Sequence, residues 1–207
     1  MTEKAPTGST LKRVRMLVWG LVVLAVAGIS GLLLIRSEPV NPQGSAPLQS
    51  NFGGPFTLVD SNGKPFSSEK LRGTPYTMYF GFTRCGDVCP TTLSRLVKLR
   101  QQLGSDDKFK ILFVTIDPAN DGPKEVGQYA TLFNSPIIGL TGSQTQIDAV
   151  KKQFGIYAQS QPNAPTGQQM AHSAIVLLFD RAGRFVTTIS PDEPDPDALA
   201  KLRQLVG

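Results

Sequence analysis

The chain has 207 residues, of which 40% are hydrophobic and 18% are charged, and its formal net charge is +5. The charge is unevenly distributed, because residues 1–36 carry a net +4 and residues 37–207 carry only +1. The excess of basic residues therefore flanks an apolar stretch and does not form a basic patch on a folded domain, which argues against nucleic acid as a partner.

Residues 16–35 form 20 consecutive positions without a charge and are rich in Leu, Val, Ile and Ala. Such a stretch is long enough to cross a hydrocarbon core of about 30 Å, so it predicts a single transmembrane anchor. A cleaved signal peptide is the alternative, with Ala25-Val26-Ala27 as an acceptable cleavage site. The apolar run continues to Ile35, which a cleaved signal would not need, and this favours the uncleaved anchor.

The orientation of the predicted anchor follows from the basic residues around it. Four of them precede it and one follows closely: Lys4, Lys12, Arg13, Arg15 and Arg36. The positive-inside rule then leaves residues 1–15 in the cytoplasm and the rest of the chain outside. The expected location is the cell inner membrane, crossed once, with the C-terminal domain in the periplasm.

A polar linker is expected at 36–50, where Ser, Pro, Asn, Gln and Gly predominate. Residues 51–207 remain, enough for one domain with its own core. Apolar patterns predict strands at 56–60, 76–82, 110–116, 136–140, 174–179 and 185–189, with Asn62-Gly63 as a hairpin turn. They predict helices at 89–103, with Pro90 in the first turn, and at 123–133, 144–154 and 197–206.

This order of strands and helices predicts an α/β domain with a mixed central sheet. A cysteine motif after an early strand is typical of the thioredoxin-like fold, here with extra N-terminal strands and a long insertion before His172.

Cys85 and Cys89 are the only cysteines of the chain, and His172 is the only histidine. The cysteines lie where a strand passes into the start of a helix, where unpaired amides and the helix dipole favour thiolate over thiol. Two thiolates and one imidazole are soft ligands suited to Cu(I), zinc or iron–sulfur centres. Three protein ligands disfavour a closed structural zinc site, so copper fits this set best.

Other interpretations of these residues stay open at this point. An extracytoplasmic cysteine pair is often a structural disulfide. The pair could also be a redox dithiol of the thioredoxin or peroxiredoxin type, although the usual thioredoxin spacing, Cys-x-x-Cys, is one residue shorter. A lone histidine such as His172 is more often an ordinary surface or core residue than a ligand.

Asp117 and Asp121 belong to an Asp-Pro-x-x-Asp segment that follows the predicted strand 110–116. Functional sites of α/β folds are built at this end of the strands. Local chemistry favours a simpler interpretation, a turn that caps the next helix.

Three blocks of residues resemble the Sco/SenC family of copper chaperones. They follow the family's order from about Asn51 to the C-terminus and comprise residues 81–93 (Gly-Phe-Thr-x-Cys-x-Asp-Val-Cys-Pro-Thr-Thr-Leu), residues 115–123 (Thr-Ile-Asp-Pro-Ala-Asn-Asp-Gly-Pro) and His172-Ser173-Ala174. The resemblance implies a thioredoxin-like fold with copper, as Cu(I), Cu(II) or both, bound by Cys85, Cys89 and His172.

The resemblance also implies a function. It is delivery of copper to the binuclear copper centre of cytochrome c oxidase subunit II or a similar recipient, supplied by an upstream copper donor. The alternative is a thiol-disulfide reductase, with Cys85 and Cys89 as its redox pair, which keeps the cysteines of that subunit reduced and needs its own thiol reductant.

Two departures from the family pattern lie beside the expected ligands. Members often have His-Cys-Pro where this chain has Arg84-Cys85-Gly86, and Asp-His where it has Ala171-His172. Neither departure replaces an expected ligand. Loss of a carboxylate at position 171 removes one candidate hydrogen-bond partner of the imidazole.

Overall fold

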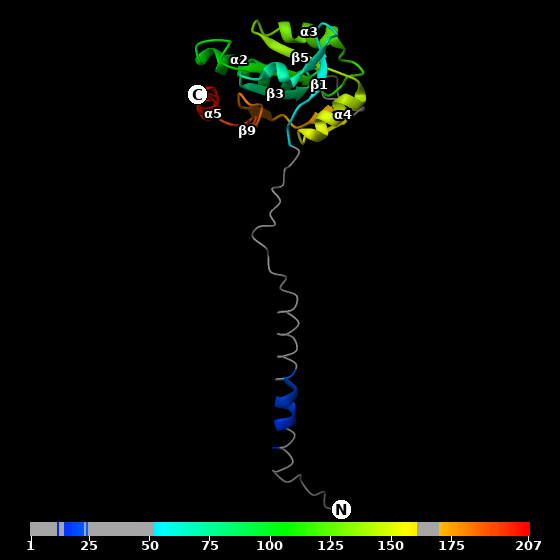
Figure 1. Ribbon diagram of the computed structural model, residues 1–207, viewed down its shortest axis with the longest axis vertical. Helices are drawn as coiled ribbons and strands as arrows, with labels where there is room; N and C mark the ends of the chain where they lie inside the picture. The colour runs from blue at the N-terminus through cyan, green and yellow to red at the C-terminus, as the bar shows by residue number, and fades with distance from the viewer. Residues whose placement is uncertain (1–11, 13–14, 23, 25–51, 161–169) are drawn as a thin grey trace, which may run out of the picture. The chain divides into compact units, whose positions relative to one another are not determined.

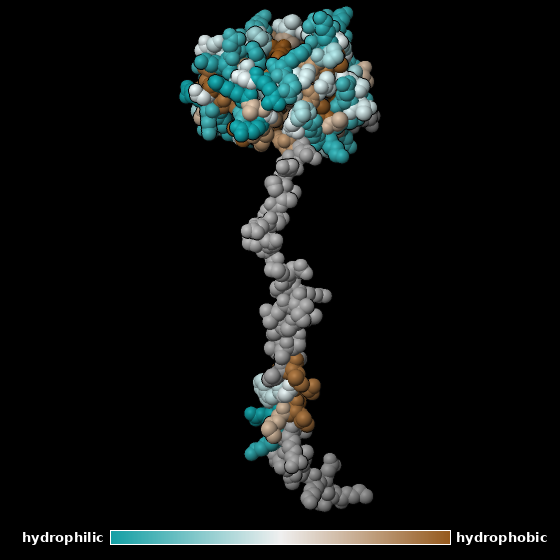
Figure 2. Space-filling view, in the orientation of Figure 1, coloured by the Kyte–Doolittle hydropathy of each residue, from teal (hydrophilic) through white to brown (hydrophobic). Residues whose placement is uncertain are grey.

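The computed structural model describes residues 12, 15–22, 24, 52–160 and 170–207. The chain divides into two units, Met1–Ser50 and Asn51–Gly207. In the first unit residues 15–22 are helical, and their large apolar side chains are exposed (Figure 2). Most of the predicted anchor, and the whole linker 36–50, lie outside the described residues. None of the helices among the residues described has both the length and the apolar character needed to cross a membrane.

A seven-stranded sheet forms the centre of the second unit, in the order β2-β1-β5-β4-β3-β8-β9 (Figure 1). The bounds are β1 Thr57–Asp60, β2 Pro65–Ser67, β3 Tyr76–Gly81, β4 Lys110–Thr115, β5 Ile137–Thr141, β8 Val176–Phe179 and β9 Phe185–Ile189. Strands β3, β4 and β5 are parallel, and the other pairs are antiparallel. The mixed sheet predicted from the sequence is therefore confirmed.

The helices are α2 Val88–Gln102, α3 Pro123–Thr131, α4 Gln144–Gln153 and α5 Asp195–Val206, with a short 3-10 helix, η1, at Ser68–Leu71. Helix α2 packs against α5, and α3 packs against β5 (Figure 1). All six residues of β3 are buried, as are the last five of β4. Continuous apolar strands of this kind need cover on both faces of the sheet.

The structure differs from the sequence-based expectation at three places. The segment predicted as a loop before His172 contains a second, two-stranded sheet of β6 Ala158–Ser160 and β7 Met170–His172. Helix α2 begins at Val88, one residue before the predicted start, and α5 begins two residues earlier than predicted. Strands β6 and β7 have three residues each, too few for an apolar alternation from which a strand could be predicted.

Phe154 lies at the centre of the aromatic core on one side of the sheet. Its ring packs against four others, at centroid distances from 5.6 to 6.3 Å: Phe52, Phe56, Phe80 and Phe179. Through Phe80, this side of the core packs against β3, the strand that ends four residues before Cys85. The face of the unit seen in Figure 2 is mostly hydrophilic, with scattered apolar residues.

Candidate metal and thiol site

The cysteine loop, residues 82–87, connects the end of β3 to the start of α2. It has no regular secondary structure, and one of its few backbone bonds runs from the Cys85 N–H to the Phe82 carbonyl, at 3.2 Å. Cys89 is the second residue of α2. The two cysteines are thus held differently, Cys85 by a loop and Cys89 by a helix.

The two sulfur-bearing side chains meet at the N-terminus of α2. Both are buried thiols, Cys85 with 7% and Cys89 with 0% of its surface exposed. The Cys89 backbone N–H, one of the amides that a helix start leaves without an internal partner, donates to the Cys85 sulfur at 3.4 Å. Asp87, at the capping position, makes no side-chain cap bond, so the Cys85 sulfur serves as an acceptor at this helix start.

The pKa of the Cys89 thiol is raised, first by its hydrogen bond to Cys85 and then by burial. The Tyr79 phenol beside it acts in the opposite direction. The raised pKa runs against the expectation that the helix start favours the thiolate, because the hydrogen bond to Cys85 and burial both favour the protonated Cys89 thiol. The pKa of Tyr79 is itself raised by burial and then by Cys89.

The loop after β4, residues 116–122, lies beside the cysteine loop because β3 and β4 are parallel and end at the same edge of the sheet. The Ile116 N–H donates to the Gly81 carbonyl at 2.8 Å and joins the two strand ends. Arg84 pairs with Asp117, with 2.6 Å between the guanidinium and the carboxylate. The expected site at the carboxyl ends of the strands thus contains residues from both loops.

Asp121 does not cap the next helix, which corrects the interpretation favoured from local chemistry. Helix α3 starts after Gly122, and no side chain caps it. The Asp121 side chain is fully buried and instead accepts hydrogen bonds from Thr83 and Thr115. Asp117 accepts the Asn120 and Asp121 N–H groups at its carbonyl, so the turn interpretation holds for this residue.

His172 ends β7, where its backbone pairs with Ala158 of β6. The side chain of His172 lies outside the described part of the structure. Strand β8, which follows, runs antiparallel to β3 with Val176 opposite Tyr79, so the segment before Val176 approaches the edge at which β3 ends. Ala174 lines a small cavity together with Thr92, one turn of α2 beyond Cys89.

The donor set of described side chains is incomplete for a metal. Among residues whose side chains are described, no three of His, Cys, Asp and Glu come together in a way that could hold an ion. Cys85 and Cys89 supply two soft donors, and a third from a neighbouring loop would complete a copper site.

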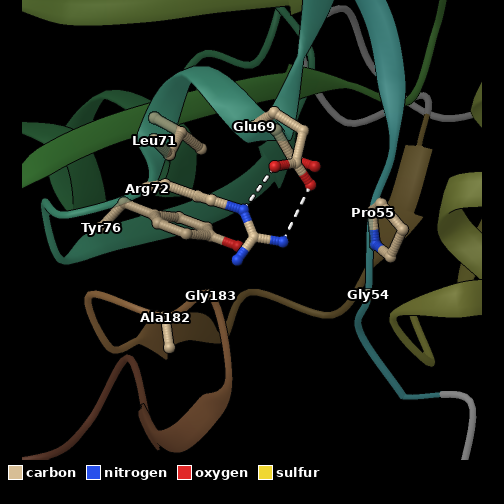
Figure 3. A pocket seen from close by; sticks show the side chains of 9 residues that line it. Gly54, Pro55, Glu69, Leu71, Arg72, Tyr76, Ala182 and Gly183 are labelled. Atoms are coloured by element: carbon tan, nitrogen blue, oxygen red, sulfur yellow. Dashed lines mark hydrogen bonds and ion pairs between the residues drawn. The ribbon is translucent and has the colours of Figure 1, made fainter.

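A pocket of about 90 Å³ lies at the opposite end of β3 from the cysteines. Tyr76, the first residue of β3, lines it together with Gly183 of the β8–β9 turn (Figure 3). The guanidinium of Arg72 in this pocket is paired with Glu69 (Figure 3). The pocket contains neither cysteine and is separate from the thiol site.

The fold and the paired thiols agree with the comparison to known families, in which the SCO1/SenC family model matches residues 44–207. The chain belongs to the SCO1/SenC family. It is 37% identical over 158 residues to the mitochondrial protein SCO2 of Saccharomyces cerevisiae, a match that covers 74% of this chain and 52% of that protein. The chain thus spans about half the length of this relative.

Two solved Sco structures resemble the domain. ScoI of Bradyrhizobium japonicum, solved with copper bound, is 35% identical, with a TM-score of 0.66 over 74% of this chain and 99% of that one. BsSco, described as a member of the Sco family of cytochrome c oxidase assembly proteins with a disulfide switch, is 26% identical, with a TM-score of 0.57 over 75% and 94%. The thioredoxin-like Sco fold expected from the sequence is confirmed.

Three residues around the thiols of this Sco domain were not singled out from the sequence. Tyr79 and Gly81 belong to the predicted strand, and Thr83 was part of the motif without a role of its own. A glycine at the end of an apolar strand does signal a close approach of another group, and this could have identified Gly81. No local signal identifies Thr83, because its partner Asp121 is 38 residues away. The role of Tyr79 depends on its contact with Cys89 of α2, which the strand pattern does not indicate.

Proposed function

We propose that this Sco protein binds copper as its cargo through the thiolates of Cys85 and Cys89 and the imidazole of His172. The observation that carries the proposal is the pair of buried thiols at the start of α2, joined by the hydrogen bond from the Cys89 amide to the Cys85 sulfur at 3.4 Å. Soft sulfur donors that share one point favour Cu(I), and an added imidazole also suits Cu(II). Copper in the Bradyrhizobium japonicum relative supports this choice of metal.

Residue His172 is the proposed third ligand. The segment from Ala174 back to His172 leads toward the end of β3, and Ala174 shares a cavity with Thr92 of α2. A three-ligand site leaves copper accessible, so that a thiolate of the recipient can bind before a ligand of the donor leaves. Ligand exchange of this kind suits a chaperone better than a permanent cofactor site.

We further propose that the recipient is the binuclear copper centre of cytochrome c oxidase subunit II or a similar acceptor. The description of BsSco as an assembly protein of that oxidase supports the assignment. In this proposal residues 16–35 anchor the chain in the inner membrane, residues 1–15 are cytoplasmic, and the domain 51–207 works in the periplasm, supplied by a copper donor.

Copper binding is tested with the full chain, reduced and purified in detergent, by metal analysis and by competition with a chelator of known copper affinity. We expect one copper per chain, no binding after Cys85→Ser or Cys89→Ser, and an affinity at least about tenfold lower after His172→Ala, a loss of about 1.4 kcal/mol. Gln159→Ala, on the same two-stranded sheet, is the matched control and should bind as wild type. Unchanged affinity in His172→Ala would remove this residue from the proposed ligand set.

A second candidate function, reduction of a target disulfide, is favoured by the side-chain hydrogen bond between Cys89 and Cys85 and by the disulfide switch described for BsSco. In this reaction Cys85 and Cys89 form a disulfide, and the two electrons and two protons that they lose convert the target disulfide into two thiols. Peptide reduction that survives His172→Ala but is lost in Cys85→Ser would support this function. A copper requirement for the same reaction would argue against it.

A further inference from the structure

Asp121 is a buried carboxylate beside the thiol site, with 0% of its surface exposed. No ion pair found within residues 52–160 and 170–207 includes it. Burial of a carboxylate without a cation is unfavourable unless hydrogen bonds compensate for the lost water. The role of the buried Asp121 carboxylate therefore follows from the groups that donate hydrogen bonds to it.

Three donors point at the Asp121 carboxylate. One oxygen accepts the Thr83 backbone N–H at 2.9 Å and the Thr115 hydroxyl at 2.6 Å, and the other accepts the Thr83 hydroxyl at 2.6 Å. Hydrogen bonds to a carboxylate are short and about twice as strong as neutral ones. Thr83 lies two residues before Cys85, so these bonds act on the cysteine loop itself.

The backbone of Asp121 is fixed from the other side. Its N–H donates to the Asp117 carbonyl at 2.9 Å, and its own carbonyl accepts the Thr141 hydroxyl of β5 at 2.6 Å. Asp121 thus joins the cysteine loop to the ends of β4 and β5, the rigid centre of the sheet.

The Arg84 to Asp117 ion pair is another side-chain connection between these loops, but half of the Arg84 side chain is exposed to solvent. Exposed ion pairs contribute little. The buried connection through Asp121 and Thr83 is therefore the stronger constraint on the loop.

We propose that Asp121 is a positioning residue that holds Thr83, and through it the Cys85 sulfur, at the distance from Cys89 at which both sulfurs can act together. Cys89 is placed by α2, whereas Cys85 lies in a loop without regular structure. The inference rests on the proposed function only in treating Cys85 and Cys89 as the working pair. The carboxylate acts by its shape and its acceptors, not by contact with the cargo.

Two variants at Asp121 distinguish a role in positioning Thr83 from an effect of the negative charge of the carboxylate. Asp121→Asn keeps an acceptor for the Thr83 and Thr115 donors, and its amide can donate to the Thr83 hydroxyl once that hydroxyl rotates. Asp121→Ala removes every side-chain bond to Thr83. A positioning role predicts a large effect for Ala and a small one for Asn.

The readout is the equilibrium of the full chain with glutathione, which requires no copper. Cys85 and Cys89 lose two electrons and two protons as they form a disulfide, and one oxidised glutathione takes them up to give two reduced molecules. We expect Asp121→Ala to lower this equilibrium constant about tenfold, because a loosened loop lowers the effective concentration of one thiol near the other. Copper affinity should fall in parallel, while Asp121→Asn stays near wild type in both measurements.

A general loss of stability is excluded with Ser143→Ala, which removes the capping box of α4 away from the cysteines. If Ser143→Ala lowers the melting temperature as much as Asp121→Ala and shifts the glutathione equilibrium equally, the positioning role is wrong. If Asp121→Ala fails to fold, Thr83→Val, which removes only the hydroxyl, should shift the equilibrium in the same direction and Thr83→Ser should restore it. An equilibrium unchanged by Thr83→Val would then overturn the inference.

The two proposals fail separately. A wild-type chain that binds no copper overturns the proposed function, and the glutathione equilibrium still tests Asp121. A shift in Asp121→Asn as large as that in Asp121→Ala would assign the effect to charge and overturn positioning.

Discussion

A Cβ atom added to Gly81 would lie 2.8 Å from the Cys89 sulfur, closer than real Cβ atoms come to other heavy atoms. The same atom would lie 3.1 Å from the rings of both Tyr79 and Phe113, so the last position of β3 is enclosed on three sides. Gly81 is therefore part of the thiol site because it has no side chain. Its empty side-chain position is the space that the Cys89 sulfur uses.

We expect Gly81→Ala to displace the Cys89 sulfur and to destabilise the fold by about 1–3 kcal/mol, the usual cost of overpacking a core. Urea unfolding gives the stability, and the copper affinity and the glutathione equilibrium report on the sulfur. Gly86→Ala is the matched control, because Gly86 lies in the adjoining cysteine loop and nothing is within 4 Å of its added Cβ. Equal effects of both substitutions would contradict the steric explanation.

The architecture of the sheet could be predicted from the sequence because its strands are local features. Strands β3 and β4 are continuous apolar runs, and the helices between the parallel strands have clear periodicity. The site was predictable only as far as Cys85 and Cys89, whose contact follows from their spacing. The small sheet of β6 and β7 could not be predicted, because its strands are three residues long and its pairing depends on backbone contacts between segments ten or more residues apart.

Asp121 illustrates why the rest could not be predicted. Its partner Thr83 is 38 residues away, and only the parallel pairing of β3 and β4 brings the two loops together. The residues around Asp121 in sequence are those of an ordinary turn, so local chemistry gave the wrong role. The raised pKa of Cys89 likewise depends on burial and on Cys85, and neither quantity can be read from the helix start alone.

Arg100 connects the far end of α2 to the sheet, and its side chain is fully buried. Its guanidinium donates to the Phe109 carbonyl at 3.2 Å, the Ser135 hydroxyl at 2.7 Å and the Pro136 carbonyl at 2.8 Å. Arg100→Met should lower the free energy of unfolding by about 3 kcal/mol, because it leaves buried acceptors without donors.

Asp106 provides the control for Arg100. It lies 3.3 Å from the guanidinium, but 40% of its side chain is exposed. Asp106→Asn should therefore cost at most about 1 kcal/mol in the same urea experiment. A loss as large as that of Arg100→Met would mean that the ion pair, and not the carbonyl contacts, stabilises this end of the helix.

The stability of the domain should fall at alkaline pH, in part because of Tyr76. Burial, and then the charge of Asp180, raises the pKa of the Tyr76 phenol to about 12 from 10.0. The unfolded chain loses this proton first as the pH rises, so the contribution of Tyr76 is fully present below pH 10 and is lost between about pH 10 and 12. Its size is on the order of 2 kcal/mol.

Denaturant unfolding at a series of pH values from about 8 to 12 measures this loss. Tyr76→Phe should reduce it, whereas Tyr157→Phe, at an exposed position, should not. Part of the loss will remain in Tyr76→Phe, because burial also raises the pKa of Tyr79 and Tyr129. An alkaline loss that is the same in wild type and Tyr76→Phe would contradict the assignment.

Arg84 stands where the Sco/SenC pattern often has a histidine before the first cysteine, and it forms an ion pair with Asp117. The paired atoms are only 2.6 Å apart, but half of the Arg84 side chain is exposed, so the coupling free energy between the two residues should be at most about 1 kcal/mol. A double-mutant cycle with Arg84→Gln and Asp117→Asn in urea unfolding measures it, with Arg72→Gln and Glu69→Gln as a matched exposed pair.

The effect of salt on the coupling free energy shows whether the Arg84 to Asp117 ion pair is exposed to solvent or shielded from water. At an ionic strength of about 1 M the screening length falls to about 3 Å, so both cycles should lose most of their coupling. Asp117 is far more buried than Arg84 and keeps its contacts to Asn120, so Asp117→Asn alone should cost more than Arg84→Gln. A coupling above about 2 kcal/mol that resists salt would show that the pair is shielded from water and that Arg84, next to Cys85, holds the cysteine loop as firmly as Asp121 does.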